Sequence, residues 1–162
     1  MNVVLVGFMG AGKTTIARIL AKKKNLRFVD TDKLIEKETG LTIKEIFKIK
    51  GEDYFRDLER QIIDRYLLFC NNCVIATGGG MPCFFNNMEK LKKIGFVIYV
   101  NVDFDRIVKR VGDSNRRPLF SNLSEAKRLF NERIKCYHKA DFVVDGNKEK
   151  EEVVQTIEKL VW

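Results

Sequence analysis

The sequence predicts an α/β fold of three layers, α/β/α, in which helices cover both faces of a five-stranded parallel sheet. Three observations lead to this prediction. Five short apolar segments, most of them rich in β-branched residues, alternate with longer stretches of helical spacing. A glycine-rich turn separates the first apolar segment from the first helical stretch. The length of 162 residues is sufficient for one domain with a substantial core and too short for a second independent domain.

The first strand, residues 3–6, leads into the glycine-rich turn, which reads GFMGAGKTT at residues 7–15. This turn fits the phosphate-binding pattern G-x-x-x-x-G-K-[ST] without a mismatch. Its backbone N–H groups and the positive end of the following helix would hold phosphate oxygens, Lys13 would reach the β- and γ-phosphates, and Thr14 would ligate Mg²⁺. A turn that merely connects a strand to a helix is the alternative. We expect a nucleoside triphosphate site formed by Gly10, Ala11, Gly12, Lys13, Thr14 and Thr15.

The second strand, residues 26–30, ends at the edge of the sheet where α/β proteins bind ligands, and it delivers Asp30 and Asp32 there. If the chain stays extended, the two side chains leave on the same face, near the phosphate-binding turn. One could serve a metal ion and the other an acceptor hydroxyl. The strand at 74–77 lacks the acidic residue that many NTPases place there, so Asp30 is the expected metal residue. Alternatively, the two aspartates only cap the next helix.

Residues 33–70 have helical spacing broken at Gly40 and Gly51, with a capping box at 42–45, and no strand signal. Helices inserted between two strands at the ligand edge indicate a substrate-binding segment. Arg56 and Glu59 are three residues apart, so the carboxylate can hold a guanidinium that suits a carboxylate or phosphate ligand. An ordinary surface ion pair explains the same spacing equally well.

The strand at 74–77 ends in Gly78, Gly79 and Gly80, where backbone without Cβ atoms can approach a ligand closely. A flexible turn is the alternative. A helix at about 84–93 and a strand at 96–100 are expected next.

A helix from 103 to 111 precedes residues 112–122, which are polar, basic and without periodicity. Few large apolar groups hold this segment down, which predicts a lid that is open or disordered without ligand and closes over the phosphates. Arg117 would then meet the γ-phosphoryl group, and Arg116 would matter less. A static surface loop is the alternative.

The chain is expected to end with a helix at 123–138, a strand at 142–144 and a helix after 148.

The formal charge of +8 favours anionic partners. Acidic residues are mixed among several of the lysine-rich stretches, which indicates solvated helix faces rather than a nucleic-acid surface. The four cysteines lack the spacing of a structural zinc site and are expected to be free thiols. No apolar run reaches the roughly 18 residues of a membrane span, so we expect a cytoplasmic protein that binds neither nucleic acid nor a membrane.

In combination, several motifs resemble those of shikimate kinases over nearly the whole chain. These are GFMGAGKTT at 7–15, DTD at 30–32, GEDYFRDLE at 51–59, TGGG at 77–80, RRPLF at 116–120, and the arginine that follows Asn131-Glu132. The resemblance implies a monomeric P-loop kinase of the nucleoside-monophosphate-kinase type. This enzyme would use ATP and Mg²⁺ to phosphorylate the 3-hydroxyl of shikimate, a step of aromatic amino acid biosynthesis. We expect a single kinase domain over 1–162, with a substrate-binding insertion at about 31–60 and a lid at about 112–122.

The resemblance also implies roles for matching residues. Lys13, Asp32 and Arg117 would be catalytic, with Asp32 holding the acceptor hydroxyl and assisting its deprotonation. Asp30, with Thr14, would support Mg²⁺, and Arg110 would lie against the adenine. The substrate site would comprise Asp32, Phe47, Phe55, Arg56, Gly78, Gly79, Gly80 and Arg133. Within it, both arginines and the Gly79 N–H would bind the carboxylate of shikimate, and the two phenylalanines would wall its ring. One departure is that family members often place a proline near the adenine, whereas this chain reads Asp-Gly-Asn-Lys at 145–148.

Two other functions remain open at this point. A related kinase could phosphorylate another hydroxy acid such as gluconate. A nucleotide switch or an RNA-binding protein would use the same phosphate-binding turn, although the guanine-reading segment N-K-x-D of GTPases is not present in the sequence.

Overall fold

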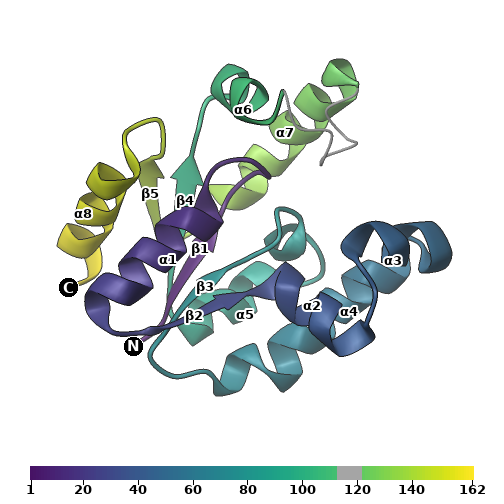
Figure 1. Ribbon diagram of the computed structural model, residues 1–162, viewed down its shortest axis with the longest axis horizontal. Coiled ribbons are helices and arrows are strands. Elements are labelled where there is room, and N and C mark those ends of the chain that lie inside the picture. The colour runs from purple at the N-terminus through teal and green to yellow at the C-terminus, as the bar shows by residue number, and fades with distance from the viewer. Residues whose placement is uncertain (113–121) are drawn as a thin grey trace.

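The computed structural model describes residues 1–112 and 122–162, which form an α/β structure (Figure 1). Its strands are β1 (Val3–Val6), β2 (Arg27–Asp30), β3 (Cys73–Ala76), β4 (Phe96–Asn101) and β5 (Phe142–Asp145). Its helices are α1 (Lys13–Lys24), α2 (Thr31–Thr39), α3 (Ile43–Lys50), α4 (Glu52–Arg65), α5 (Asn87–Ile94), α6 (Phe104–Val111), α7 (Leu123–Tyr137) and α8 (Lys150–Val161). Two short 3₁₀ helices are η1 (Leu67–Phe69) and η2 (Met81–Cys83).

The described strands form one sheet in the order β2-β3-β1-β4-β5, and every neighbouring pair is parallel. Strand β1 is central, and all four of its residues are fully buried, as expected for a strand covered on both faces. The chain leaves β1 toward β2 on one side and later returns to β4 on the other. Ligands of α/β proteins bind outside the carboxyl ends of the strands at such a reversal of strand order. The predicted five-stranded parallel sheet is confirmed.

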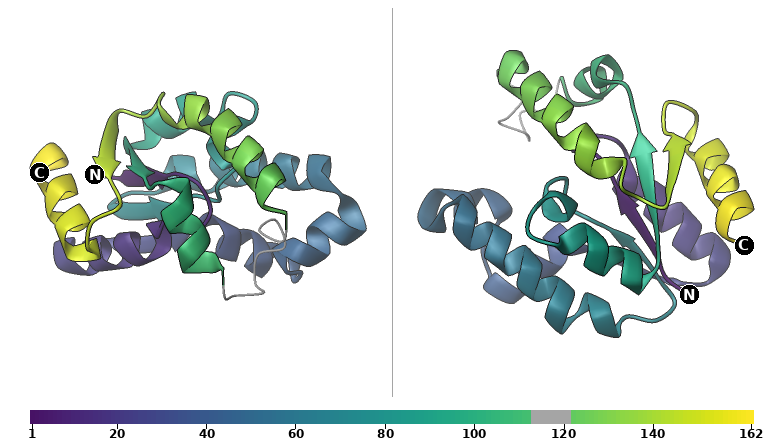
Figure 2. Two further views of the ribbon diagram at one scale, coloured as in Figure 1. Left: turned by 90° about the horizontal axis from the view of Figure 1, so that it is seen from above. Right: turned by 180° about the vertical axis from the view of Figure 1, so that it is seen from behind.

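Helices cover both faces of the sheet. Helices α1 and α8 lie side by side on one face (Figure 1). From behind, α5 lies in front of the sheet, with α4 and α7 to either side of it (Figure 2). The predicted three-layer arrangement is therefore confirmed.

The segment between β2 and β3 is helical, as predicted, and it extends beyond the β2 edge of the sheet (Figure 1). Gly40 ends α2 with φ 71°, a left-handed conformation that glycine adopts without a steric cost. Thr42 and Glu45 form the predicted capping box at the start of α3. Buried isoleucines anchor the insertion to the core: Ile35, Ile46, Ile62 and Ile63.

Three predicted boundaries differ from the structure. Helix α1 begins at Lys13, inside the segment 7–15 that the sequence analysis assigned to the turn, because Gly12 already occupies the cap position. The predicted helix at 84–93 begins only at Asn87, whose side-chain amide donates to the Met81 carbonyl and closes the turn that follows η2. The helical pattern that reached residue 70 ends as α4 at Arg65, followed by η1.

No helix in the described parts of the chain is both long and apolar enough to cross a membrane. Within these residues, no group of three or more His, Cys, Asp or Glu side chains is placed to hold a metal ion. The four cysteines are free thiols, as predicted.

Of the predicted lid, residues 113–121 lie outside the described residues, and Arg116 and Arg117 with them.

Candidate active site

The phosphate-binding turn joins β1 to α1 and is shaped by its own backbone. Gly10 and Gly12 have φ angles of 85° and 91°, which side chains with a Cβ rarely adopt. The Lys13 ammonium donates to the carbonyls of Gly7 (2.6 Å) and Phe8 (3.0 Å) and is only 7% exposed. Because Gly12 caps α1 without a side chain, no side-chain cap occupies the N–H groups of the first turn, which remain available to an anion.

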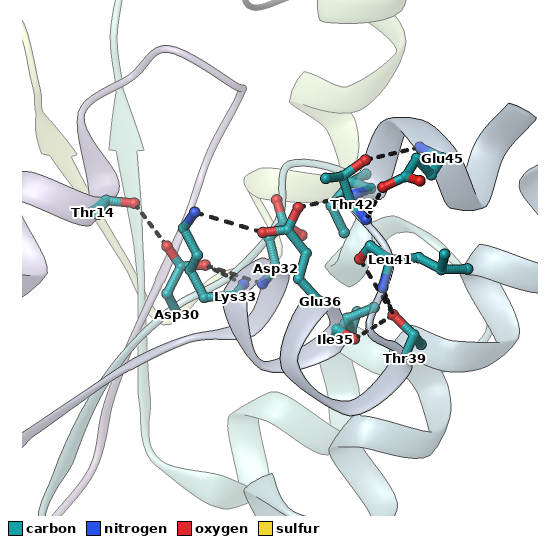
Figure 3. A network of polar contacts seen from close by, with 11 residues as sticks. Thr14, Asp30, Asp32, Lys33, Ile35, Glu36, Thr39, Leu41, Thr42 and Glu45 are labelled. Atoms are coloured by element: carbon teal, nitrogen blue, oxygen red, sulfur yellow. Dashed lines mark hydrogen bonds and ion pairs between the residues drawn. The ribbon is translucent and has the colours of Figure 1, made fainter.

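Asp30 links this turn to the insertion (Figure 3). One carboxylate oxygen, Oδ1, accepts from the backbone N–H groups of Asp32 (3.0 Å) and Lys33 (3.3 Å), which makes Asp30 the N-cap of α2. The other, Oδ2, lies 3.4 Å from the Thr14 hydroxyl. The expectation that extended chain carries Asp30 and Asp32 onto one face is wrong, because helix α2 begins at Thr31. The helix-capping alternative is realised for Asp30, which at the same time faces Thr14.

A carboxylate oxygen beside a threonine hydroxyl suits Mg²⁺, which prefers oxygen ligands and is usually bound by few protein groups together with substrate phosphates. Thr14 and Asp30 therefore fit the metal role that the sequence predicts for them.

The three glycines after β3, residues 78–80, form a glycine strip on which Asp32, Arg133 and Arg56 converge. A methyl group built on Gly78 would lie 2.6 Å from Oδ1 of Asp32, and one built on Gly79 would lie 3.5 Å from Nη1 of Arg133. On Gly80, it would lie 2.7 Å from Cζ of Arg56. Any larger residue at Gly78 or Gly80 would displace the neighbouring carboxylate or guanidinium.

The glycine strip is fixed from both sides. The Gly78 N–H donates to the Thr31 hydroxyl at 2.9 Å, and the Thr77 hydroxyl donates to the Leu5 carbonyl at 2.9 Å. A flexible turn is therefore not what the structure contains at these positions.

Arg56 is held deep inside the insertion. Its Nη1 donates to Glu59 Oε1 at 2.7 Å, and the two side chains are only 7% and 0% exposed. The guanidinium also lies over three aromatic rings, at 4.2 Å from the centroid of Phe84, 5.2 Å from that of Phe55 and 6.0 Å from that of Phe47. An ordinary surface ion pair is excluded by this burial.

Glu59 is a buried carboxyl close to Asp32. Burial raises its pKa to about 7, although the neighbouring Arg56 acts in the opposite direction, and the charge of Asp32 adds to the rise. Among the described residues, Oε2 of Glu59 has no hydrogen-bond partner. The pair with Arg56 therefore holds a carboxyl that changes protonation near neutral pH.

Helix α7 supplies the second arginine. Arg133 is 7% exposed, and its guanidinium lies 6.0 Å from the centroid of the Phe8 ring. One helical turn further, the buried Tyr137 hydroxyl donates to the Gly79 carbonyl at 2.6 Å. Sequence reasoning missed Tyr137, since an aromatic residue on the inner face of a helix is typical of the core.

The remaining predicted residues occupy two places. The rings of Phe47 and Phe55 lie 4.8 Å apart beside Arg56. Arg110 lies against the phosphate-binding turn, where it donates to the carbonyls of Ala11 (3.2 Å) and Gly146 (3.4 Å). Phe84 was not predicted as part of the site, and neither was Lys150, which lies near Gly12. The predicted catalytic Arg117 falls outside the described residues.

Comparisons with known proteins agree on one family. The family model described as "Shikimate kinase" matches residues 9–161. A shikimate kinase from Persephonella marina is 47% identical over 141 residues, which cover 86% of this chain and 85% of that protein. The crystal structure of shikimate kinase from Aquifex aeolicus has 40% identity and a TM-score of 0.88, covering 98% of this chain and 95% of that one. Shikimate kinase from Acinetobacter baumannii in complex with shikimate has 34% identity and a TM-score of 0.92, covering 98% of this chain and 91% of that one.

Proposed function

We propose that this chain, which belongs to the shikimate kinase family, uses the residues around the glycine strip at 78–80 to present shikimate to ATP. The chain is a shikimate kinase, an ATP-dependent phosphotransferase of aromatic amino acid biosynthesis. Its reaction converts shikimate and ATP to shikimate 3-phosphate and ADP. Both substrates are small molecules, and both carry negative charge.

The observation that carries the assignment of residues is the glycine strip. Successive glycines face Asp32, Arg133 and Arg56, so one carboxylate and two guanidinium groups converge on a short stretch of bare backbone. An acceptor with a carboxylate at one end and a hydroxyl at the other matches this distribution of charge. Arg56 and Arg133, with the Gly79 N–H, bind the carboxylate of shikimate, since a planar guanidinium can donate two parallel hydrogen bonds to it.

The other end of the acceptor lies at Asp32. Its carboxylate accepts a hydrogen bond from the 3-hydroxyl, which orients the oxygen toward the γ-phosphorus and takes up its proton as the new O–P bond forms. The bond between the γ-phosphorus and the bridging oxygen of ADP breaks in the same transfer. Phosphoryl transfer depends mainly on positioning and charge neutralisation, so Lys13 supplies positive charge at the phosphoryl group that moves.

Thr14 and Asp30 hold Mg²⁺ in this proposal, supported by the 3.4 Å separation of their oxygens. Mg²⁺ bound with ATP would neutralise charge on the β- and γ-phosphates. Phe47 and Phe55 wall the ring of shikimate, and Arg110 of α6 contacts the adenine, supported by its hydrogen bond to the Ala11 carbonyl of the phosphate-binding turn.

The proposal extends to features of the whole chain. It acts as a monomer with one kinase domain over 1–162, in which residues 31–60 bind the acceptor and residues 112–122 close as a lid that brings Arg117 to the phosphates. We further propose that it works in the cytoplasm and binds neither nucleic acid nor membrane. The ion pairs of Lys23 and Lys24 with Glu158 argue against a nucleic-acid surface at this place, because they neutralise part of a basic helix face.

The test is ATP turnover with a panel of acceptors that includes shikimate, quinate and gluconate. We expect ADP release that depends on shikimate, with a product phosphorylated at the 3-oxygen by phosphorus NMR. Equal turnover with gluconate would contradict the assignment of the acceptor, and ADP release without any acceptor would contradict a kinase.

A further inference from the structure

Lys150 reaches from helix α8 to the phosphate-binding turn, although none of the motifs includes it. A methyl group built on Gly12 would lie 2.9 Å from Lys150 Cε, closer still to its ammonium nitrogen, and 3.7 Å from Nη1 of Arg110. Two cationic side chains from α8 and α6 therefore meet beside the residue that caps α1.

Neither cation of this pair forms an ion pair in the described part of the chain. Arg110 donates to the neutral carbonyls of Ala11 and Gly146, and Lys150 takes part in no ion pair among residues 1–112 and 122–162. Burial and repulsion by Arg110 lower the pKa of the Lys150 ammonium, and attraction by the neighbouring Glu149 opposes this to a smaller extent.

The backbone adds to the positive potential at this place. Lys150 is the first residue of α8, where a positive side chain meets the positive end of the helix dipole and is disfavoured. The N-terminal turn of α1, with N–H groups directed at the phosphate site, begins at the same Gly12. An arrangement that costs stability in the free protein is explained if a bound anion offsets it.

We propose that Lys150 is a further nucleotide-binding residue whose ammonium contacts the α-phosphate of ATP. This rests on the proposed function, which places the triphosphate along the turn at 7–15. Thr14 and Asp30 lie at the β2 side of the turn, where the γ-phosphate faces the acceptor. Helix α8 lies on the opposite side of α1 from the insertion (Figure 1), so Lys150 approaches the nucleotide from its other end. The α-phosphate is the anionic group at that end.

The test is calorimetric binding of AMP, ADP and adenosine to the full chain and to Lys150→Ala, Lys150→Arg and Lys150→Glu. We expect Lys150→Ala to weaken AMP and ADP by the same factor, roughly tenfold for one charge-assisted contact, and adenosine by less than about twofold. Lys150→Arg should retain affinity within about threefold, and Lys150→Glu should bind more weakly than Lys150→Ala. Lys148→Ala, an exposed lysine two residues earlier, is the matched control and should bind like the wild type.

Three results would overturn the proposal: AMP and ADP affinities that Lys150→Ala leaves unchanged, a loss seen for ADP alone, or a loss that Lys150→Arg or Lys148→Ala reproduces. Thermal unfolding of each variant identifies losses that come from misfolding. If Lys150→Ala is unstable, Lys150→Glu supplies the comparison, and a folded Lys150→Glu that binds AMP and ADP like the wild type would overturn the proposal. Binding is measured without turnover. If the wild type fails to phosphorylate shikimate but Lys150→Ala weakens AMP binding, the proposed function is refuted and this inference is supported. If the wild type phosphorylates shikimate but Lys150→Ala binds AMP as tightly as the wild type, the proposed function is supported and this inference is refuted.

Discussion

The phosphate-binding turn and the acceptor region solve the same problem, the binding of an anion, by different means. The turn consists of consecutive residues and holds Lys13 with carbonyls of its own backbone. The acceptor region takes Asp32 from α2, Arg56 from α4 and Arg133 from α7, and joins them at glycines that follow β3.

The two regions also differ in what surrounds their cations. The Lys13 ammonium donates to two backbone carbonyls of its own turn. Arg56 instead shares its charge with a buried carboxyl, Glu59. The lesson is that a local motif can position its cation with its own backbone, whereas a site assembled from distant segments buries a side chain, here Glu59, that acts as an internal counter-ion when it is ionised.

The largest expected effect comes from the local motif. Lys13→Ala should lower kcat by about 10³-fold, because it removes the positive charge on the moving phosphoryl group. Steady-state kinetics with saturating ATP and shikimate measure this. Lys22→Ala, an exposed lysine of the same helix, should retain wild-type kcat. Wild-type turnover in Lys13→Ala would refute the phosphate site.

The internal counter-ion of the acceptor region predicts a pH dependence of stability. Because the pKa of Glu59 is raised to about 7 in the folded chain, the folded state holds this proton more tightly than the unfolded state. Its contribution to stability is fully present below about pH 4.5 and is lost as the pH rises through 7, by up to roughly 3 kcal/mol.

Urea unfolding of the wild type and Glu59→Gln between pH 4.5 and 8 tests this. The stability of the wild type relative to Glu59→Gln should fall with increasing pH, whereas Glu38→Gln, an exposed change on α2, should leave the slope unaltered. A difference that is constant with pH would show that Glu59 does not titrate in this range.

Asp32 tests whether the acceptor region takes part in the chemical step. Asp32→Asn keeps the size of the side chain and removes the negative charge that orients the hydroxyl and accepts its proton. We expect kcat to fall about 10²-fold with little change in the KM for ATP. Asp53→Asn on α4 is the control for the loss of one negative charge. An effect confined to the KM for ATP would place Asp32 with the nucleotide.

The smallest effect is expected at Arg56, where a conservative change separates charge from shape. Arg56→Lys retains the charge but loses the planar pair of donors, so the KM for shikimate should rise about tenfold and that for ATP by less than about twofold. Arg60→Lys makes the same change one turn further on α4 and should leave the KM for shikimate unaltered. An equal loss in both variants would remove Arg56 from the acceptor site.

The two regions also mark what the sequence could predict. Gly10 to Thr15 were predictable as a site because the pattern is contiguous and its spacing is dictated by phosphate geometry. Lys150, at the other end of the chain, reaches the same turn through the packing of α8 on α1, which no local pattern records. The alternation of strands and helices likewise made the layers predictable. The start of α5 was not, because it depends on a hydrogen bond from the Asn87 side chain to the Met81 carbonyl in the preceding turn.

The residues of the acceptor region were predictable as one site only because they match positions in the motifs of shikimate kinases. The spacing of Arg56 and Glu59 indicates an ion pair, but their burial depends on rings that come from other segments, such as Phe84. Tyr137 has the sequence environment of a core residue, and its hydrogen bond to Gly79 exists only in the folded chain. For Asp30 and Asp32, the assumption of extended geometry was wrong because Asp30 is itself the N-cap of α2, so the chain is helical from Thr31 onward.

The central claim is that the two regions bind different ligands independently of one another. Calorimetry with ADP and with shikimate on the wild type, Lys13→Ala and Arg56→Lys tests it most directly. We predict that Lys13→Ala weakens ADP at least about tenfold and shikimate by less than about twofold, and that Arg56→Lys does the reverse. If either variant weakened both ligands by the same factor, the division between the phosphate-binding turn and the acceptor region would be contradicted.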